Sequence, residues 1–232
     1  MKLVRKEMEI NGKTFLVCGA SGALGSELVK LLREQGAKVL GTATSNDTAA
    51  RIPAGVEVRL LLDYTKPESI KTLTDYLIAS TEIDGIINAS GVVAFGEASQ
   101  LEPETLRKLF EINALGPIQL LSALAGLLAK KAESVVVNLT GVVAEAALPG
   151  IAAYSSSKFA IDGFLQATAR EWRRNGTRVI SARPGHTETG LADRAIAGVA
   201  PKFPPGKTAS EVAGRILQAI LSDEKELPSS AF

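Results

Sequence analysis

Two side chains with acid–base chemistry lie one helical turn apart. Tyr154 and Lys158 begin and end the stretch Tyr-Ser-Ser-Ser-Lys. A tyrosine has an ordinary pKa of about 10, and a nearby ammonium favours its phenolate form and lowers that pKa. Residues at i and i+4 share a helix face, so we expect Lys158 to activate Tyr154 as a proton donor or acceptor. The same spacing also occurs in ordinary amphipathic helices, so the pair needs support from elsewhere in the chain.

A glycine-rich turn supplies a second kind of chemistry. It stands between an apolar run at 14–18 and a helical pattern at 23–35. Glycines there let the backbone approach a pyrophosphate, while the helix N-terminus supplies amide donors. The spacing is not G-x-G-x-x-G, but the strand–turn–helix context favours dinucleotide binding over a simple closing turn. The candidate contact residues of the turn are Gly19, Ser21, Gly22, Leu24 and Gly25.

Short apolar runs alternate with longer helical patterns along the chain. Strands are predicted at 14–18, 38–41, 56–62, 83–88, 134–139 and 177–182. Helices are predicted at 23–35, 67–79, 103–131 with a break near Gly116-Pro117, 153–175 and 210–221. This alternation predicts an α/β fold, namely a Rossmann-like, doubly wound parallel sheet in three α/β/α layers. We expect one domain over 1–232, with 186–207 as a mobile loop over a site or a surface connection.

Composition excludes several classes of protein. The 232 residues include 26 Lys and Arg against 25 Asp and Glu, so the net charge is +1 and no basic nucleic-acid surface is expected. The single Cys allows no internal disulfide. No secretory signal and no membrane span are predicted, and we expect a cytoplasmic protein. The single His, with no ligand spacing around it, predicts no metal site.

Several motifs occur together in a familiar order, and the chain resembles the short-chain dehydrogenase/reductase family from about Gly12 to Thr189. They are the glycine turn, Asn88-Ala89-Ser90-Gly91, Asn113, the Tyr154–Lys158 stretch and Pro184-Gly185. Within the family, residues 36–45 are similar to bacterial 3-oxoacyl-carrier-protein reductases. The resemblance implies hydride transfer between a nicotinamide cofactor and a carbonyl or alcohol substrate.

The resemblance also implies roles for individual residues. Tyr154 would be the acid–base residue, Lys158 would hold the nicotinamide ribose hydroxyls, and Asn113 would hold a water in a proton relay. Beyond the glycine turn, the implied cofactor contacts are Thr44, Asp63, Tyr64, Asn88, Gly91, Tyr154, Lys158, Pro184, Gly185 and Thr187.

The end of the second predicted strand bears on the choice of cofactor. An NAD site places a carboxylate there, whereas Thr44 and Ser45 stand in this chain before the first acid, Asp47. Hydroxyl groups could instead hydrogen-bond a 2′-phosphate. We therefore predict NADP rather than NAD.

One departure from the family pattern concerns catalysis directly. The family's catalytic Ser lies thirteen residues before the Tyr, a position held by Gly141 in this chain. Thr140 carries a hydroxyl next to it, but it replaces the Ser only if the chain has already turned, because neighbours on a strand face opposite ways. Otherwise the substrate or a water supplies the missing donor, or the protein catalyses poorly. The alternative function is a dinucleotide-binding protein with little turnover, acting as a sensor or assembly partner.

The expected partners follow from the same resemblance. The substrate is a small carbonyl or alcohol compound, with a carrier-bound acyl chain as a further option, and apolar residues such as Val92, Val93 and Val142 favour an apolar one. Family members pair the two long helices into a homodimer or homotetramer. The chain ends at Phe232 without the glycine-rich segment used in tetramers, so a dimer is the better supported prediction.

Overall fold

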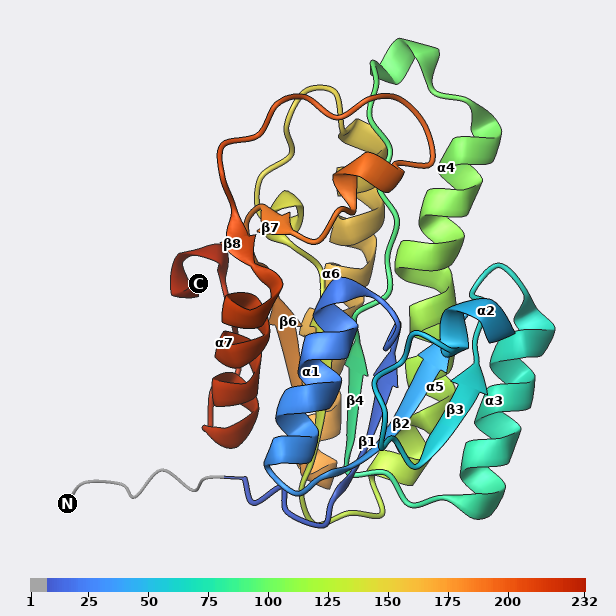
Figure 1. The fold of residues 1–232 in the computed structure, drawn as a ribbon, viewed down its shortest axis with the longest axis vertical. Helices are drawn as coiled ribbons and strands as arrows, with labels where there is room; N and C mark the ends of the chain where they lie inside the picture. The colour runs from blue at the N-terminus through green and yellow to red at the C-terminus, as the bar shows by residue number, and fades with distance from the viewer. Residues whose placement is uncertain (1–7) are drawn as a thin grey trace.

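Six parallel strands form the centre of the molecule. The computed structural model describes residues 8–232 (Figure 1). The strands are β1 (Thr14–Cys18), β2 (Lys38–Ala43), β3 (Val58–Leu61), β4 (Gly85–Asn88), β5 (Ser134–Leu139) and β6 (Thr177–Ala182). Their order is β3-β2-β1-β4-β5-β6, so the winding reverses between β1 and β4. In doubly wound sheets ligands bind beyond the carboxyl ends of the strands at such a reversal. The predicted fold class is confirmed.

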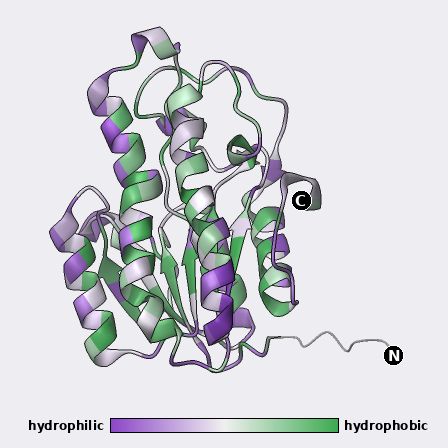
Figure 2. Cartoon of the chain, turned by 180° about the vertical axis from the view of Figure 1, so that it is seen from behind, coloured by the Kyte–Doolittle hydropathy of each residue, from purple (hydrophilic) through white to green (hydrophobic). Residues whose placement is uncertain are grey.

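Helices cover both faces of the sheet (Figures 1 and 2). One face carries α1 (Ala23–Glu34) and α7 (Ala209–Leu221), and the other carries α3 (Pro67–Ser80), α5 (Gly116–Leu128) and α6 (Ala152–Trp172). The helix α4 (Pro103–Phe110) leads toward α5 and packs on α6. A single turn, α2 (Asn46–Ala49), follows β2 and was not predicted. Figure 2 shows mostly green, apolar strands between helices that carry both green and purple residues.

Alternate residues of each strand enter two separate cores. In β1, Phe15 and Val17 pack in the core under α1 and α7, whereas Leu16 packs in the core under α3, α5 and α6. Successive side chains of a strand point to opposite faces, and both faces here are covered. This double burial explains why the inner strands β1, β4 and β5 consist largely of consecutive apolar residues.

The helix does not break near Gly116-Pro117 as predicted; a π-turn precedes these residues instead. Residues Glu111–Leu115 form this turn, and the helical path continues from α4 through it into α5. Pro117 has no N–H to bond the carbonyl four residues earlier, and a π-turn just before it relieves that mismatch. By length and composition, Pro103–Leu128 could cross a membrane, but half of its most apolar window is buried inside the protein.

The segment at 186–207 is docked on the molecule rather than free. The short strands β7 (Thr187–Glu188) and β8 (Lys207–Thr208) pair in parallel near its two ends. Between them, the Ile196 N–H donates to the Val93 carbonyl at 2.8 Å, and the Phe95 N–H donates to the Ala197 carbonyl at 2.9 Å. Further 3₁₀ turns lie at Ala98–Gln100, Val142–Ala144, Arg173–Asn175, Ala192–Arg194 and Ser229–Ala231.

A glycine inside α7 offers a stability test. Nothing lies within 4 Å of a Cβ added at Gly214, so Gly214→Ala should raise the free energy of unfolding by about 0.5–1 kcal/mol through the lower entropy of the unfolded chain. Gly85→Ala should instead lower the free energy of unfolding, because its Cβ would lie 2.3 Å from the Phe15 ring. Urea unfolding followed by circular dichroism measures both. A destabilised Gly214→Ala together with an unchanged Gly85→Ala would contradict the packing described.

Candidate active site

Two buried asparagines stand near the carboxyl ends of the neighbouring strands β4 and β5. In the parallel register, Cys18 of β1 lies beside Asn88 of β4, and Asn88 lies beside Asn138 of β5. The Asn88 Nδ2 donates to the Asn138 Oδ1 at 2.6 Å, and both side chains are buried. The remaining Asn138 amide nitrogen has no partner among residues 8–232. Asn88 was predicted from its motif, whereas Asn138 was missed, although a polar residue ending an apolar strand could have signalled it.

The glycine turn that follows β1 leaves no room for a side chain at Gly19 or Gly25. Gly19 has φ +75°, and a Cβ on it would lie 2.8 Å from the Ser90 Oγ. A Cβ on Gly25 would lie 2.1 Å from the Gly19 carbonyl oxygen. Gly22 precedes α1 without a side-chain cap, so the first amides of the helix stay available for an anion. Ser21 and Leu24 lie half-buried beside them, and the turn has the form that a pyrophosphate requires.

The π-turn carries Asn113 into the site. Its Oδ1 accepts from the Val92 N–H at 3.0 Å, and its Nδ2 donates to the Val92 carbonyl at 2.9 Å and to the Ser157 Oγ at 3.0 Å. A Cβ on Gly91 would lie 3.3 Å from both the Asn113 Oδ1 and the Lys158 Nζ. The structure thus brings Gly91, Asn113 and Lys158 together, as the motifs predict.

Tyr154 and Lys158 share one face of α6, but their electrostatics differ from the expectation. The Lys158 Nζ lies 5.9 Å from the Tyr154 ring centroid and donates to the Leu139 carbonyl at 2.9 Å. Burial raises the pKa of Tyr154 to about 12. Burial also lowers the pKa of Lys158 to about 8. The expected lowering of the Tyr154 pKa by Lys158 is therefore wrong for the protein alone, because desolvation dominates and the ammonium points to a carbonyl.

Thr140 does not replace the missing serine. Its hydroxyl lies 2.7 Å from the Ser181 Oγ and 3.2 Å from the Ala182 carbonyl, and the side chain is buried. Gly141 has φ +84°, and the nearest atoms to a Cβ there lie at 3.8 Å. A side chain would therefore fit the space at 141 but not the backbone conformation. The Ser181 Oγ in turn donates to the buried Asp162 at 2.5 Å, so the Thr140 hydroxyl is tied into the protein behind the site.

The predicted adenine-side residues divide into two groups. Thr44 is exposed just beyond β2, and its hydroxyl lies 3.5 Å from that of Thr48. Asp63 is held by Thr65 and Lys66; burial opposes its ionisation, but these hydrogen bonds and the charge of Lys66 outweigh burial and lower its pKa. Tyr64, in contrast, is buried beneath α5 and donates its hydroxyl to the Asn88 Oδ1 at 3.1 Å. We expected a cofactor contact from Tyr64, but this packing gives it a supporting position under Asn88.

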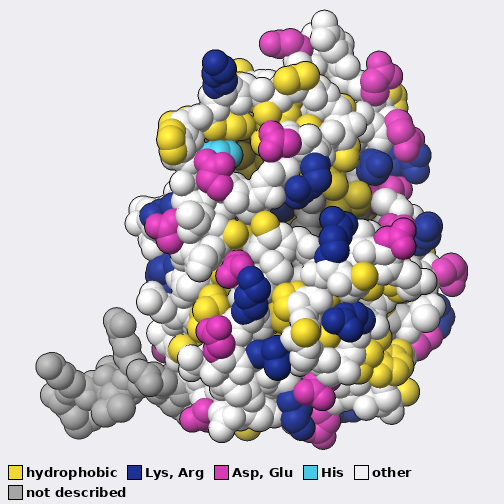
Figure 3. Space-filling view, in the orientation of Figure 1, with side chains coloured by type: hydrophobic (Ala, Val, Ile, Leu, Met, Phe, Trp, Pro, Cys, Tyr) yellow, Lys and Arg dark blue, Asp and Glu magenta, His cyan; other side chains and the backbone are white. Residues whose placement is uncertain are grey.

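The segment after β6 forms the opposite wall of the site. The buried Pro184 accepts from the Val142 N–H at 2.9 Å, which ties the segment to the Gly141 region. Gly185 is exposed, and its carbonyl accepts from the Thr187 hydroxyl at 3.0 Å. His186 stacks on Phe203 at 4.7 Å between ring centroids. Figure 3 shows apolar side chains around this histidine. Within residues 8–232, no three His, Cys, Asp or Glu side chains gather as a metal site would require.

Comparison with known proteins assigns the family. A model of the short chain dehydrogenase family matches residues 13–199, so the chain belongs to this family of oxidoreductases. The chain is 30% identical over 227 residues to 3-oxoacyl-[acyl-carrier-protein] reductase from Escherichia coli K12, covering 94% of this chain and 93% of the relative. It is 28% identical over 195 residues to 2-dehydro-3-deoxy-D-gluconate 5-dehydrogenase from Bacillus subtilis 168, covering 82% and 76%. The predicted resemblance is confirmed.

A solved structure agrees with the fold and bears on the cofactor. A short chain dehydrogenase from Burkholderia cenocepacia J2315, in complex with NADP, has a TM-score of 0.84 at 25% identity, covering 96% of this chain and 90% of that one. Members of the family bind a nicotinamide cofactor. The glycine turn, the open amides of α1 and the unpartnered Asn138 amide are features that fit such a group.

Substitution at Gly25 tests the turn. Gly25→Ala places a Cβ 2.1 Å from the Gly19 carbonyl, so the turn must open and nicotinamide cofactor affinity should fall about tenfold or more, a loss of about 1.4 kcal/mol. NADPH fluorescence titration measures the affinity, with Gly214→Ala as a folded control that binds normally. Unchanged affinity in Gly25→Ala would show that the cofactor does not use this turn.

The buried ammonium of Lys158 predicts a pH dependence of stability. Between its folded pKa of about 8 and the unfolded value of 10.5, the unfolded chain holds a proton that the folded chain has lost. Unfolding therefore takes up a proton, and folding stability rises with pH in this window. The unfolding free energy of the wild type minus that of Lys158→Met should grow by about 2 kcal/mol between pH 8 and pH 10. Urea unfolding at each pH gives this difference, and a flat difference would contradict a depressed pKa.

Proposed function

We propose that the protein is an NADP-dependent oxidoreductase that transfers hydride between the nicotinamide and a carbonyl or alcohol substrate, with Tyr154 as the acid–base residue. The observation that carries the proposal is the convergence of Gly91, Asn113 and Lys158 beside Tyr154, from three separate parts of the chain. An ordinary amphipathic helix pair would not require a glycine and a buried asparagine at the same place.

The protonation states suit Tyr154 as a proton donor. Its pKa of about 12 keeps the phenol protonated at neutral pH, and no described residue hydrogen-bonds its hydroxyl. When bound, the nicotinamide ring supplies or accepts the hydride. Tyr154 gives its proton to the substrate oxygen as that oxygen becomes an alkoxide. The resulting phenolate is more basic than the Lys158 amine, so a proton moves from Lys158 toward Tyr154 through a bridging hydroxyl or water.

The predicted contact residues have distinct tasks toward the cofactor. The glycine turn and the start of α1 would hold the pyrophosphate. Lys158 would hold the nicotinamide ribose, and Pro184, Gly185 and Thr187 would line the nicotinamide end. Asp63 would meet the adenine. The hydroxyls of Thr44, Ser45 and Thr48 lie beyond β2 and would hydrogen-bond a 2′-phosphate, which supports NADP over NAD.

The substrate is proposed to be an apolar carbonyl or alcohol compound. Val93 is buried beside the docked segment, and Phe95 packs on Phe203 with ring centroids 6.2 Å apart. Leu148, Val199 and Phe203 add exposed apolar side chains near this part of the molecule. A carrier-bound acyl chain fits the same chemistry, and the reductase from Escherichia coli supports it.

We further propose a homodimer through α4, α5 and α6. Leu106 of α4, Leu115 of the π-turn and Phe159 of α6 are large hydrophobic side chains exposed on these helices. Burial of such side chains against a second copy would remove apolar surface from water. A cytoplasmic location remains the prediction from the sequence.

A second candidate function is cofactor binding with little or no turnover. It is favoured by Gly141, which has no hydroxyl, and by Thr140, whose hydroxyl is bonded to Ser181 and Ala182 instead of facing the site. Loss of one oxyanion-type donor costs on the order of a hundredfold or more in rate. The protein would then act as a sensor or an assembly partner.

Tyr154→Phe separates binding from chemistry. The variant keeps the ring but lacks the proton donor, so NADPH should bind within about twofold of the wild type while carbonyl-dependent NADPH oxidation falls by a factor on the order of a hundred or more. Fluorescence titration measures the binding, and absorbance with a broad panel of carbonyl compounds measures the oxidation. Equal turnover in the wild type and Tyr154→Phe would remove Tyr154 from the reaction.

Gly141→Ser, assayed with the same panel, distinguishes the two candidate functions. The added hydroxyl has room, but the positive φ should cost about 1–2 kcal/mol of stability. We expect turnover in the wild type and faster turnover in Gly141→Ser. Tight NADPH binding with no turnover in either form would sink the reductase proposal, and turnover only in the variant would identify a disabled reductase. Failure to bind either nicotinamide cofactor would remove both candidates.

A further inference from the structure

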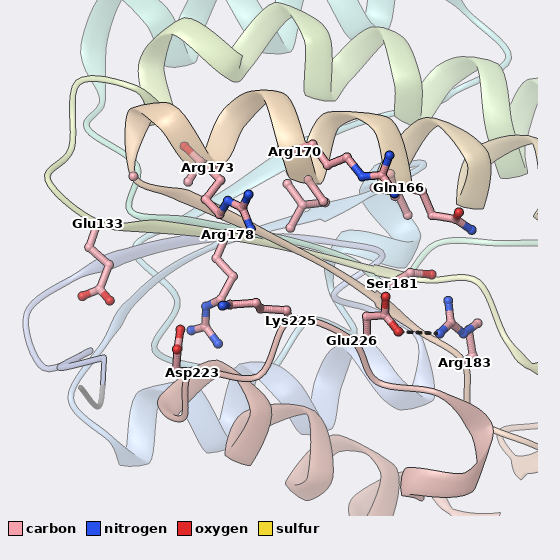
Figure 4. A pocket seen from close by; sticks show the side chains of 15 residues that line it. Glu133, Gln166, Arg170, Arg173, Arg178, Ser181, Arg183, Asp223, Lys225 and Glu226 are labelled. Atoms are coloured by element: carbon pink, nitrogen blue, oxygen red, sulfur yellow. Dashed lines mark ion pairs between the residues drawn. The ribbon is translucent and has the colours of Figure 1, made fainter. Parts of the chain in front are cut away.

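Arg183 links two elements that surround the candidate active site. It stands directly between β6 and Pro184-Gly185, and its side chain is only 12% exposed. Its Nε donates to the Glu145 Oε1 at 2.7 Å, and its Nη1 donates to the Asp162 Oδ1 at 3.3 Å. Its Nη2 lies 3.9 Å from the exposed Glu226, the contact dashed in Figure 4. One largely buried guanidinium thus joins the loop after β5 to α6.

The loop in question, residues 141–144, carries no polar side chain. Gly141 stands where the family pattern places its catalytic serine, and the 3₁₀ turn Val142–Ala144 packs on α6, the helix that carries Tyr154. The loop therefore cannot orient itself through side-chain hydrogen bonds of its own. Polar side chains act on its position through the residues that flank it.

Asp162 of α6 connects with both ends of this loop. Its side chain is buried, and its Oδ1 accepts from the Ser181 hydroxyl at 2.5 Å. The Ser181 Oγ lies 2.7 Å from the hydroxyl of Thr140, the residue just before the loop. The same Oδ1 accepts from Arg183, which bonds Glu145, the residue just after the loop. A continuous chain of hydrogen bonds therefore runs from Thr140 through Asp162 to Glu145.

The helix that carries Asp162 also carries the candidate acid–base pair. Tyr154, Lys158 and Asp162 follow one another at intervals of four residues, so they lie along one side of α6. The Lys158 Nζ donates to the Leu139 carbonyl, two residues before Gly141. The loop is thus held to the same side of α6 that carries Tyr154.

Glu145 is also bonded from the C-terminal end of the chain. Ser229 donates its N–H to the Glu145 Oε1 at 3.0 Å, and it donates its hydroxyl to the Oε2. Together with the bond from Arg183, three hydrogen bonds from two residues restrict this carboxylate to one orientation. The carboxylate therefore stays directed at Arg183, although the Glu145 side chain is partly exposed.

We propose that Arg183 is a positioning residue of the candidate active site. By holding Glu145 against Asp162, it fixes the loop relative to the Tyr154 side of α6, and hence where a substrate oxygen stands relative to the Tyr154 hydroxyl. Gly141 has no side chain to orient that oxygen, so the placement depends on the loop as a whole. The effect on the reaction rests on the proposed function, whereas the effect on the loop does not.

Hydrogen exchange followed by mass spectrometry tests the effect on the loop without cofactor or substrate. In Arg183→Met, peptides covering 140–150 should exchange about tenfold or more faster, while peptides of the glycine turn and α1 exchange as in the wild type. Arg215→Met is the matched control. Arg215 pairs with Glu224 at 2.5 Å and donates to the Ala231 carbonyl at 2.9 Å, so it also holds the C-terminal end, but it takes no part in the chain of hydrogen bonds through Asp162.

Two results of this measurement would overturn the proposal. One is exchange at the wild-type rate in Arg183→Met, and the other is equally fast exchange of the loop in Arg215→Met, which would make the effect a general loss of stability. Arg183→Lys keeps the charge, but a single ammonium cannot replace the fork that reaches both carboxylates, so its exchange should lie between that of the wild type and Arg183→Met. This milder variant also decides the question if Arg183→Met does not fold.

Steady-state kinetics tests the consequence for the proposed reaction. With a carbonyl compound that the wild type reduces, kcat should fall about tenfold or more in Arg183→Met, because a small displacement of the reacting atoms is costly in rate. The KM for NADPH should stay within about twofold, because the glycine turn is separate from this loop, and Arg215→Met should keep the wild-type kcat. An unchanged kcat in Arg183→Met overturns the proposal. A wild type without turnover rejects the proposed function alone, and hydrogen exchange then still decides whether Arg183 positions the loop.

Discussion

Burial of the parallel sheet on both faces is the constraint on which the rest of the structure depends. Because α1 and α7 cover one face and α3, α5 and α6 cover the other, the strands carry apolar side chains on both sides. In the inner strands β4 and β5, the polar residues Asn88 and Asn138 stand near the carboxyl ends. The carboxyl ends of β1, β4 and β5 lie side by side, so the glycine turn, Asn88 and Asn138 meet at one edge. The site is a consequence of that packing.

The same edge shows how the loss of one side chain changes a site. At 141 the chain has a positive φ and no side chain, while the adjacent Thr140 is bonded to Ser181, which reaches the buried Asp162. The hydroxyl nearest to position 141, that of Thr140, is therefore hydrogen-bonded inside the protein and does not face the site. Tyr154 keeps a high pKa because burial acts on it without compensation from Lys158. Under the proposed function, reduction, in which Tyr154 would give up a proton, suits this state better than alcohol oxidation, which would need the phenolate first.

The outer strand β6 differs from the inner strands in how its two edges are paired. An inner strand has both edges paired, but β6 has a neighbour only on the β5 side. Arg178 and the Leu227 bridge hold the chain after α7 against the outer edge of β6. Thr177, Val179 and Ser181 of this strand are accordingly buried.

Sequence patterns predicted the strands and main helices well, because apolar periodicity and glycine turns are local. They also predicted that Gly91, Asn113 and Lys158 belong together, since the motifs occur in a familiar order. The π-turn at Glu111–Leu115 and the β7–β8 pair were not predicted. The π-turn arises because Pro117 has no N–H to continue the helical hydrogen bonds. The β7–β8 pair joins residues about twenty positions apart in the chain.

By itself, therefore, the sequence determined the fold class, the order of the elements and the residue types available for chemistry. Only the tertiary structure decided which of them face the site: it buried Tyr64 beneath α5, turned the Thr140 hydroxyl toward Ser181 and aimed Lys158 at the Leu139 carbonyl. The physical reason is that the direction of a side chain and its pKa depend on neighbours from distant segments, whose approach no local pattern encodes.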